Sequence, residues 1–71
     1  MDNLKISLAA ARVNAGLTQS EVAENMRVSK TTIVSWEKGY TPIGVAELDY
    51  LSRLYDMPLE HILLPKGTTK A

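Results

Sequence analysis

Residues 17–39 constrain the fold of this chain most, because they carry the start and stop signals of two short helices joined by a tight turn. Thr18 and Glu21 have the spacing of a capping box, in which each side chain binds the backbone amide of the other residue. A helix is therefore predicted to begin at Gln19. Its apolar positions recur with helical spacing and stop at Arg27, so this helix is predicted to be short and to end at the turn.

A second helix, over residues 30–38, is predicted directly after the turn. Ser29 is a favourable N-cap residue, and Gly39 supplies the left-handed conformation that commonly ends a helix. Ile33 and Trp36 are three positions apart and form one inner stripe, so they are predicted to pack in the core and not to stack on bases. The first turn is otherwise polar. Its short or flexible side chains could reach base edges and phosphates in the major groove of DNA.

The spacing of these residues resembles the helix-turn-helix of the Cro and CI phage-repressor family, also called XRE-type. The positions that carry the resemblance are Arg12, Gly16, Leu17-Thr18-Gln19, Glu21-Val22-Ala23, Ser29, Ile33 and Trp36-Glu37-Lys38-Gly39. The similarity extends more weakly from about Leu4 to Leu63. It implies an all-α fold, a compact five-helix bundle of the lambda-repressor-like DNA-binding type.

The pattern outside the motif predicts three further helices. A stripe of apolar residues over 4–15 predicts a first helix, which Gly16 ends. Apolar residues at every third or fourth position over 45–55 predict a fourth helix, and Asp56 is expected to turn the corner. A last short helix over 58–63 is predicted to open with a proline.

The length and composition of the chain fit one small domain. The sequence has 71 residues, near the lower limit for a domain that folds without disulfides or bound metal ions. We expect a single helix-turn-helix domain over residues 1–65, with the motif at 17–39, and a flexible tail over 66–71. Cysteine is absent, so no disulfide framework or thiolate metal site is expected. No segment approaches the roughly 20 apolar residues of a membrane span, so we expect a cytoplasmic, nucleoid-associated protein of a bacterial or phage-infected cell.

The charge of the chain is lower than expected for a DNA-binding domain. Eight basic and eight acidic residues give a net charge of zero, whereas such domains are usually basic. The charge is polarised along the sequence, because residues 27–45 carry three cations against Glu37, while residues 46–63 carry four acids against Arg53. One face can therefore be positive on a neutral molecule. We expect weaker and less salt-dependent DNA binding than a basic relative would show.

The resemblance implies DNA-contacting roles for polar residues in and around the second motif helix. The implied base contacts are Lys30, Thr31 and Ser35, and the implied phosphate contacts are Gln19, Thr32, Lys38, Tyr40 and Arg27. The alternative for the polar helix residues is a solvated face without a ligand. Gln19 could instead serve only the helix start, and Tyr40 could instead pack under the loop that follows the helix.

One pair of residues follows the family pattern, and two features depart from it. The family usually pairs a first-helix arginine with the glutamate of the second motif helix, which implies an Arg12–Glu37 ion pair; the alternative is that Arg12 touches phosphate. Arg27 stands where most relatives have glycine, so either it adopts a left-handed conformation at a cost of about 1 kcal/mol or the turn differs. The loop over residues 40–44 lacks the basic residues of many relatives, which weakens its hold on phosphates.

The expected function is sequence-specific binding of double-stranded DNA by a transcriptional regulator, expected to be a repressor of phage, prophage or mobile-element type. Such domains bind palindromic operators as homodimers. The apolar candidates for the dimer contact, which could equally cap the monomer core, are Leu59, Ile62, Leu63 and Leu64. Two alternatives remain: a protein-interaction adaptor on the same scaffold, favoured by zero net charge, and an autoregulating antitoxin.

No chemistry other than DNA binding is indicated by the sequence. His61 is the only histidine, and no second soft ligand stands at helical spacing from it, so no metal is expected. A serine, histidine and acid pattern is also lacking, so we expect no enzymatic activity. No cofactor and no small-molecule ligand are expected either.

Overall fold

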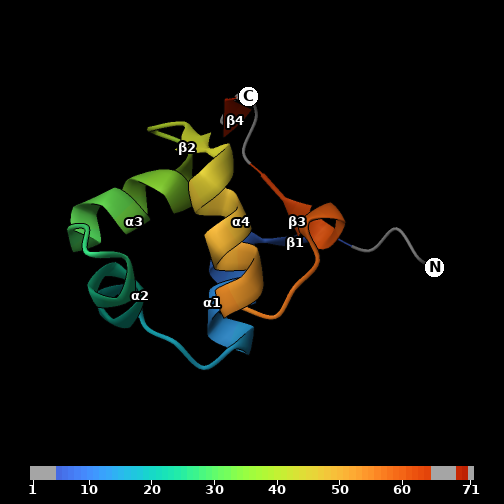
Figure 1. The fold of residues 1–71 in the computed structure, drawn as a ribbon, viewed down its shortest axis with the longest axis horizontal. Helices are drawn as coiled ribbons and strands as arrows, with labels where there is room; N and C mark the ends of the chain where they lie inside the picture. Colours follow the sequence, from blue (N-terminus) through green and yellow to red (C-terminus); the bar gives the residue numbers. More distant parts are fainter. Residues whose placement is uncertain (1–4, 65–68, 71) are drawn as a thin grey trace.

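The structure is a computed structural model that describes residues 5–64 and the backbone of residues 69–70. Four α-helices make up most of this part of the chain (Figure 1): α1 is Leu8–Asn14, α2 is Gln19–Met26, α3 is Lys30–Lys38 and α4 is Val45–Leu54. Two pairs of very short parallel strands join distant segments: β1 (Ile6–Ser7) pairs with β3 (Ile62–Leu63), and β2 (Ile43–Gly44) pairs with β4 (Thr69–Lys70). The fold is thus mainly helical, with strands that connect segments distant in sequence.

The two motif helices begin and end where the sequence predicts. The Thr18 hydroxyl accepts a hydrogen bond from the Glu21 amide at 3.1 Å, and the Glu21 carboxylate accepts one from the Thr18 amide at 2.8 Å. The Ser29 hydroxyl accepts from the Thr32 amide at 3.2 Å. Gly39 ends α3 with φ of 80°. These contacts confirm the capping box, the second N-cap and the glycine stop.

Arg27 ends α2 in the left-handed conformation, with φ of 59° and ψ of 42°. In this position the Val28 amide donates to the Ala23 carbonyl at 3.0 Å, which satisfies one of the last carbonyls of the helix. The sequence left open whether Arg27 adopts a left-handed conformation or the turn differs, and the structure shows the left-handed conformation. A non-glycine residue therefore accepts the geometry that most relatives give to glycine.

The helix α1 is shorter at its start than the sequence pattern predicts. Its N-cap is Ser7, whose hydroxyl accepts from the Ala10 amide at 3.0 Å, and Gly16 follows the helix with φ of 78°. Residues 6 and 7 belong to β1, so the predicted stripe from Leu4 does not continue as helix through them. Leu4 itself lies outside the described residues. The glycine stop is confirmed.

The predicted fourth helix and its corner are also confirmed. The α4 helix begins after Gly44, which makes no side-chain cap. Beyond its end, Asp56 adopts a positive φ of 53°. The Met57 amide then donates to the Ser52 carbonyl at 2.9 Å, and the Ser52 hydroxyl donates to the Met57 carbonyl at 2.6 Å. Asp56 therefore reverses the chain after α4.

The prediction of a fifth helix over residues 58–63 is wrong. Only Leu59–His61 coils, as one 3₁₀ turn, and Ile62–Leu63 extends as β3 beside β1, with Ile6 opposite Ile62. The reason is non-local, since pairing with β1 satisfies backbone groups that a last helical turn would have bonded locally. Thr69–Lys70 pairs with β2, whereas residues 66–68 and 71 lie outside the described part, so the flexible tail over 66–71 stays a prediction.

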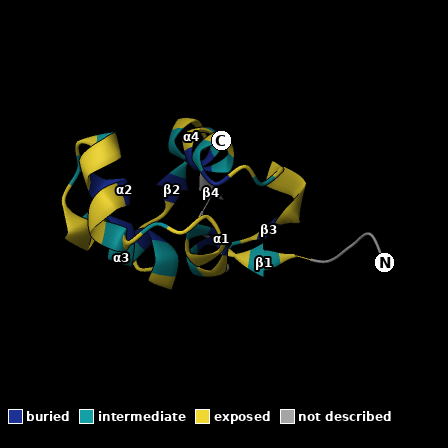
Figure 2. Cartoon of the chain, turned by 90° about the horizontal axis from the view of Figure 1, so that it is seen from below, coloured by how far each residue is buried: buried dark blue, intermediate teal, exposed yellow. Residues whose placement is uncertain are grey.

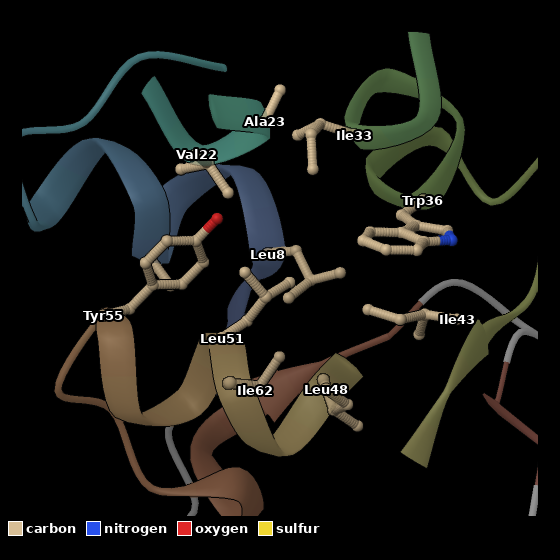
Figure 3. Close-up of a cluster of buried hydrophobic side chains, with 11 residues drawn as sticks. Leu8, Val22, Ala23, Ile33, Trp36, Ile43, Leu48, Leu51, Tyr55 and Ile62 are labelled. Carbon is tan, nitrogen blue, oxygen red and sulfur yellow. The ribbon is translucent and has the colours of Figure 1, made fainter. Parts of the chain in front are cut away.

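The core lies between the motif helices on one side and α1 and α4 on the other (Figure 2). Leu8 and Leu51 occupy its centre, with Tyr55 on one side and Trp36 on the other (Figure 3). The most deeply buried large side chains are Leu8, Ile33, Ile43, Leu51 and Val22. Each such side chain contributes about 1.5–3 kcal/mol by leaving water. Met26 and Leu54 are half-buried against this cluster.

Candidate nucleic-acid interface

The helix α3 has one face in the core and one face toward solvent. At about 100° per residue, positions 30, 31, 34, 35 and 38 share one side of a helix. On this outward face Lys30, Thr31 and Lys38 are exposed, and Ser35 is half-buried. On the opposite face Ile33 is 1% exposed and Trp36 is 8% exposed. The inner face of α3 therefore packs against the core, and its mainly polar outward face is left accessible to a ligand.

Val34 was not among the candidate contacts, although it lies in the middle of the outward face. It is half-buried and stands one helical turn from both Lys30 and Lys38. Helical periodicity alone could have identified it, because residues four apart lie on the same side. An apolar side chain at this place suits contact with a thymine methyl group.

Arg12 and Glu37 form an ion pair behind α3. Arg12 Nε donates to Glu37 Oε2 at 2.7 Å, and Nη2 donates to Oε1 at 3.4 Å. Nη1 of the same guanidinium donates to the Leu17 carbonyl at 2.9 Å. The two side chains are only 13% and 7% exposed. All three guanidinium nitrogens thus have partners within the protein, and the acid of α3 is neutralised away from solvent.

Gln19, at the start of α2, is joined to this ion pair. Its Nε2 donates to Glu37 Oε1 at 2.9 Å, across 18 positions of sequence. This hydrogen bond could not be predicted from the sequence, because no local pattern relates the first residue of α2 to the eighth residue of α3. Gln19 remains half-buried and accessible at the surface. It therefore connects the interior ion pair to the α2 terminus.

A shallow depression of about 510 Å³ opens beside the start of α2. Its lining combines the end of α1 at Val13, the start of α2 at Gln19 and Ser20, and the start of α3 at Lys30. A helix N-terminus carries a partial positive charge and free amides, which favour anions. The Lys30 ammonium lies beside the same depression, so its lining offers positive charge and hydrogen-bond donors that could bind a phosphate group.

Three exposed cations of the described residues lie on or beside the motif helices, where α2 also carries the exposed acids Glu21 and Glu24. Arg27, Lys30 and Lys38 are all exposed, whereas the acid nearest to them in α3 is held by Arg12. Tyr40 is 75% exposed, so the alternative that it packs under the loop is wrong. Its phenol is free to meet a ligand beside α3.

Thr32 lies in the first turn of α3, next to the N-cap residue Ser29. Its hydroxyl lies 3.0 Å from the Ser29 hydroxyl, within the N-cap of the helix. The side chain is half-buried. Because a hydroxyl both donates and accepts, this contact leaves Thr32 able to bind a second group.

The apolar residues predicted for the dimer contact divide into two groups. Leu59 is 41% exposed and Leu63 is 56% exposed. Ile62 is 5% exposed and packs in the core, which is the alternative that the sequence left open for these residues. Leu64 is half-buried and packs against the core. Strand alternation explains the split, because β3 points Ile62 inward and Leu63 outward.

Tyr55 lies close to the interior ion pair from the side of α4. It is 3% exposed, and Figure 3 shows its hydroxyl pointing away from α4 toward Val22 of α2. Burial, the largest cause, and the negative charge of Glu37 together raise the pKa of Tyr55 to about 12, against the opposing positive charge of Arg12. The phenol therefore stays protonated at neutral pH.

Neither a cluster of metal ligands nor a membrane-spanning helix is found in the part of the chain that the structure describes. No three acidic, histidine or cysteine side chains gather there as metal ligands would. Among its helices, none has the length and apolar character needed to cross a membrane.

The helix-turn-helix family model matches residues 8–62, which run from the start of α1 into β3. No curated protein and no solved structure matches the chain. The family match covers most of the chain and includes both capped helices, the inner face of α3 and the Arg12–Glu37 pair. These are the features on which the resemblance rested in the sequence, and regulators of this family bind double-stranded DNA. The chain therefore belongs to the XRE-type, Cro/CI-like helix-turn-helix family of DNA-binding transcription regulators.

Proposed function

We propose that this protein is a sequence-specific repressor, of phage or mobile-element type, that places α3 in the major groove of its operator. The observation that carries this proposal is the outward face of α3, which is polar and free while Ile33 and Trp36 anchor the opposite face. A recognition helix needs both properties, because it must present side chains to base edges and keep a fixed position.

The side chains proposed to read bases stand on the outward face of α3. Lys30 can donate to guanine O6 and N7, and the hydroxyls of Thr31 and Ser35 can bond to base edges. Val34 lies between them and supplies an apolar surface for thymine methyl groups. Lys30 also borders the depression at the start of α2, so its ammonium stands at the boundary between base and phosphate contacts.

A second group of side chains is proposed to hold the DNA backbone. Lys38 is the last residue of α3 and Tyr40 lies in the loop after it, and both are exposed. Gln19 lines the depression at the start of α2, and Thr32 and Arg27 stand at the edges of the motif. Phosphate contacts fix the register of the protein on the duplex without selecting a sequence.

We propose that the protein binds a palindromic operator as a homodimer. Dimers of this class place two recognition helices in successive major grooves about one helical turn, roughly 34 Å, apart. Leu59 and Leu63 are the exposed apolar side chains next to β3 that could meet a second copy. Ile62 suits this role less well, because it is buried in the core.

The zero net charge favours one rival function, that of a protein-interaction adaptor on the same scaffold. The salt dependence of DNA binding separates the two. A dimer that neutralises four to six phosphates should show log affinity falling against log salt with a slope of about −4 to −5. A slope near zero, or no binding to any duplex, would favour the adaptor. The measurement is fluorescence anisotropy with a labelled duplex between about 50 and 200 mM salt.

A further inference from the structure

We propose that Glu37 is a positioning residue for DNA binding, because it fixes the orientation of the Gln19 amide and turns one N–H of that amide toward phosphate. This inference rests on the proposed function, since it assigns a partner to the contact of Gln19 with the DNA backbone. Glu37 itself would not touch DNA, because its side chain is only 7% exposed.

The orientation of the Gln19 amide follows from the chemistry of its partner. An ionised carboxylate only accepts hydrogen bonds, so the amide must present Nε2 and not its carbonyl oxygen. Nε2 lies 2.9 Å from Glu37 Oε1. Without such a partner, rotation of the side chain can place either the nitrogen or the oxygen of the amide at this position, because the two groups are similar in size. Glu37 therefore selects one of the two orientations.

The carboxylate of Glu37 is itself held in place. Arg12 donates to both of its oxygens, at 2.7 and 3.4 Å, and the same guanidinium is tied to the Leu17 carbonyl. This arrangement crosses three elements, with Arg12 in α1, Glu37 in α3 and Gln19 in α2. Charged partners at this burial make shorter and stronger hydrogen bonds than neutral ones. The amide is thus fixed by a rigid support and not by solvent.

The remaining N–H of the amide is the group that can serve DNA. An amide nitrogen carries two hydrogens, and Glu37 uses one of them. Gln19 also lines the depression at the start of α2, beside Lys30. Phosphate oxygens only accept hydrogen bonds, so an N–H facing the depression attracts them, whereas an amide oxygen in its place would repel them. The orientation set by Glu37 therefore decides whether Gln19 helps or hinders binding.

The first test is made on the free protein. Gln19 is the single glutamine of the sequence, so selective ¹⁵N-glutamine labelling gives one pair of side-chain amide protons in an NMR spectrum. We expect one proton of the pair to exchange slowly with water and the other rapidly. Addition of operator duplex should slow the exchange of the second proton. Equal, rapid exchange of both protons in the free protein would overturn the inference.

The second test is a double-mutant cycle on the operator recovered by selection. Gln19→Met keeps the length of the side chain and removes its donor, so affinity should fall about tenfold or more. Glu37→Gln should lower the affinity of the wild type by a similar factor but that of the Gln19→Met protein less than twofold. An equal loss in both backgrounds would overturn the inference, because Glu37 would then act on binding without Gln19.

The cycle needs a control for charge and for folding. Asp49→Asn makes the same change of net charge as Glu37→Gln, at an exposed ion pair with Arg53, so it should leave affinity within twofold. Folding of each variant is checked by circular dichroism at the temperature of the assay. If Glu37→Gln does not fold, the exchange of the Gln19 protons decides the inference. If the wild type binds no duplex while one Gln19 proton is protected, the proposed function fails and the geometry stands.

Discussion

Replacement of Arg27 by glycine should stabilise the protein, because Arg27 holds the left-handed conformation at the end of α2 with φ of 59°. A residue with a Cβ pays about 1–2 kcal/mol there. Glycine avoids this cost but loses about 0.4–1 kcal/mol through its greater freedom in the unfolded chain. The midpoints of these two ranges give a net gain of about 0.8 kcal/mol. For a domain of this size such a gain raises the melting temperature by roughly 2–8 °C.

The assay is thermal unfolding followed by circular dichroism, with Arg27→Ala as the matched control. Alanine removes the guanidinium but keeps the Cβ, so it should give no comparable gain in stability. Both variants should lower the steepness of the salt dependence of DNA binding by about the same amount if Arg27 contacts phosphate. Equal stability of Arg27→Gly and the wild type would refute the reasoning about strain, as would an equal gain from Arg27→Ala.

Three further predictions concern the interior ion pair, Tyr55 and the outward face of α3. Arg12→Ala should lower the free energy of unfolding, measured by urea denaturation, by about 3–5 kcal/mol, because it leaves a buried carboxylate without its charged partner. Asp49→Asn, at an exposed ion pair, should lower it by less than about 1 kcal/mol, and similar losses for the two variants would contradict the burial argument. Since the pKa of Tyr55 is raised to about 12, its protonated phenol contributes up to about 3 kcal/mol to the free energy of unfolding below pH 10, and this contribution is lost as pH rises through 12. Denaturation curves of Tyr55→Phe should show a smaller loss of stability over this alkaline range. Lys30→Ala should change the base preference in selected DNA, whereas Lys38→Ala should weaken binding to all sequences and reduce the salt slope by about 1; identical profiles for the two variants would contradict the assignment.

The motif helices could be predicted from sequence because their boundaries depend on local interactions. The contact between Thr18 and Glu21 spans three residues, and the cap at Ser29 also acts within one turn. Gly39 needs no partner to favour a left-handed conformation. The inner stripe of α3 follows from helical periodicity alone. These signals are sufficient to place both helices and to identify the outward face of α3.

The features that sequence analysis missed depend on contacts between distant segments. A proline and a short apolar run suggested a last helix over residues 58–63, but β3 forms instead because β1 lies beside it. The same pairing shortens α1 and buries Ile62. The hydrogen bond from Gln19 to Glu37 joins two helices across 18 positions. Patterns within one element carry no information on which partner a side chain meets across the core.

The most direct test of the central claim is selection of bound duplexes from a random DNA library at low and moderate salt. The account predicts enrichment of a palindrome whose half-sites are about ten base pairs apart, with weaker recovery at the higher salt. Failure to enrich any sequence at either salt, by a protein shown to be folded, would contradict it and would favour the adaptor or the antitoxin.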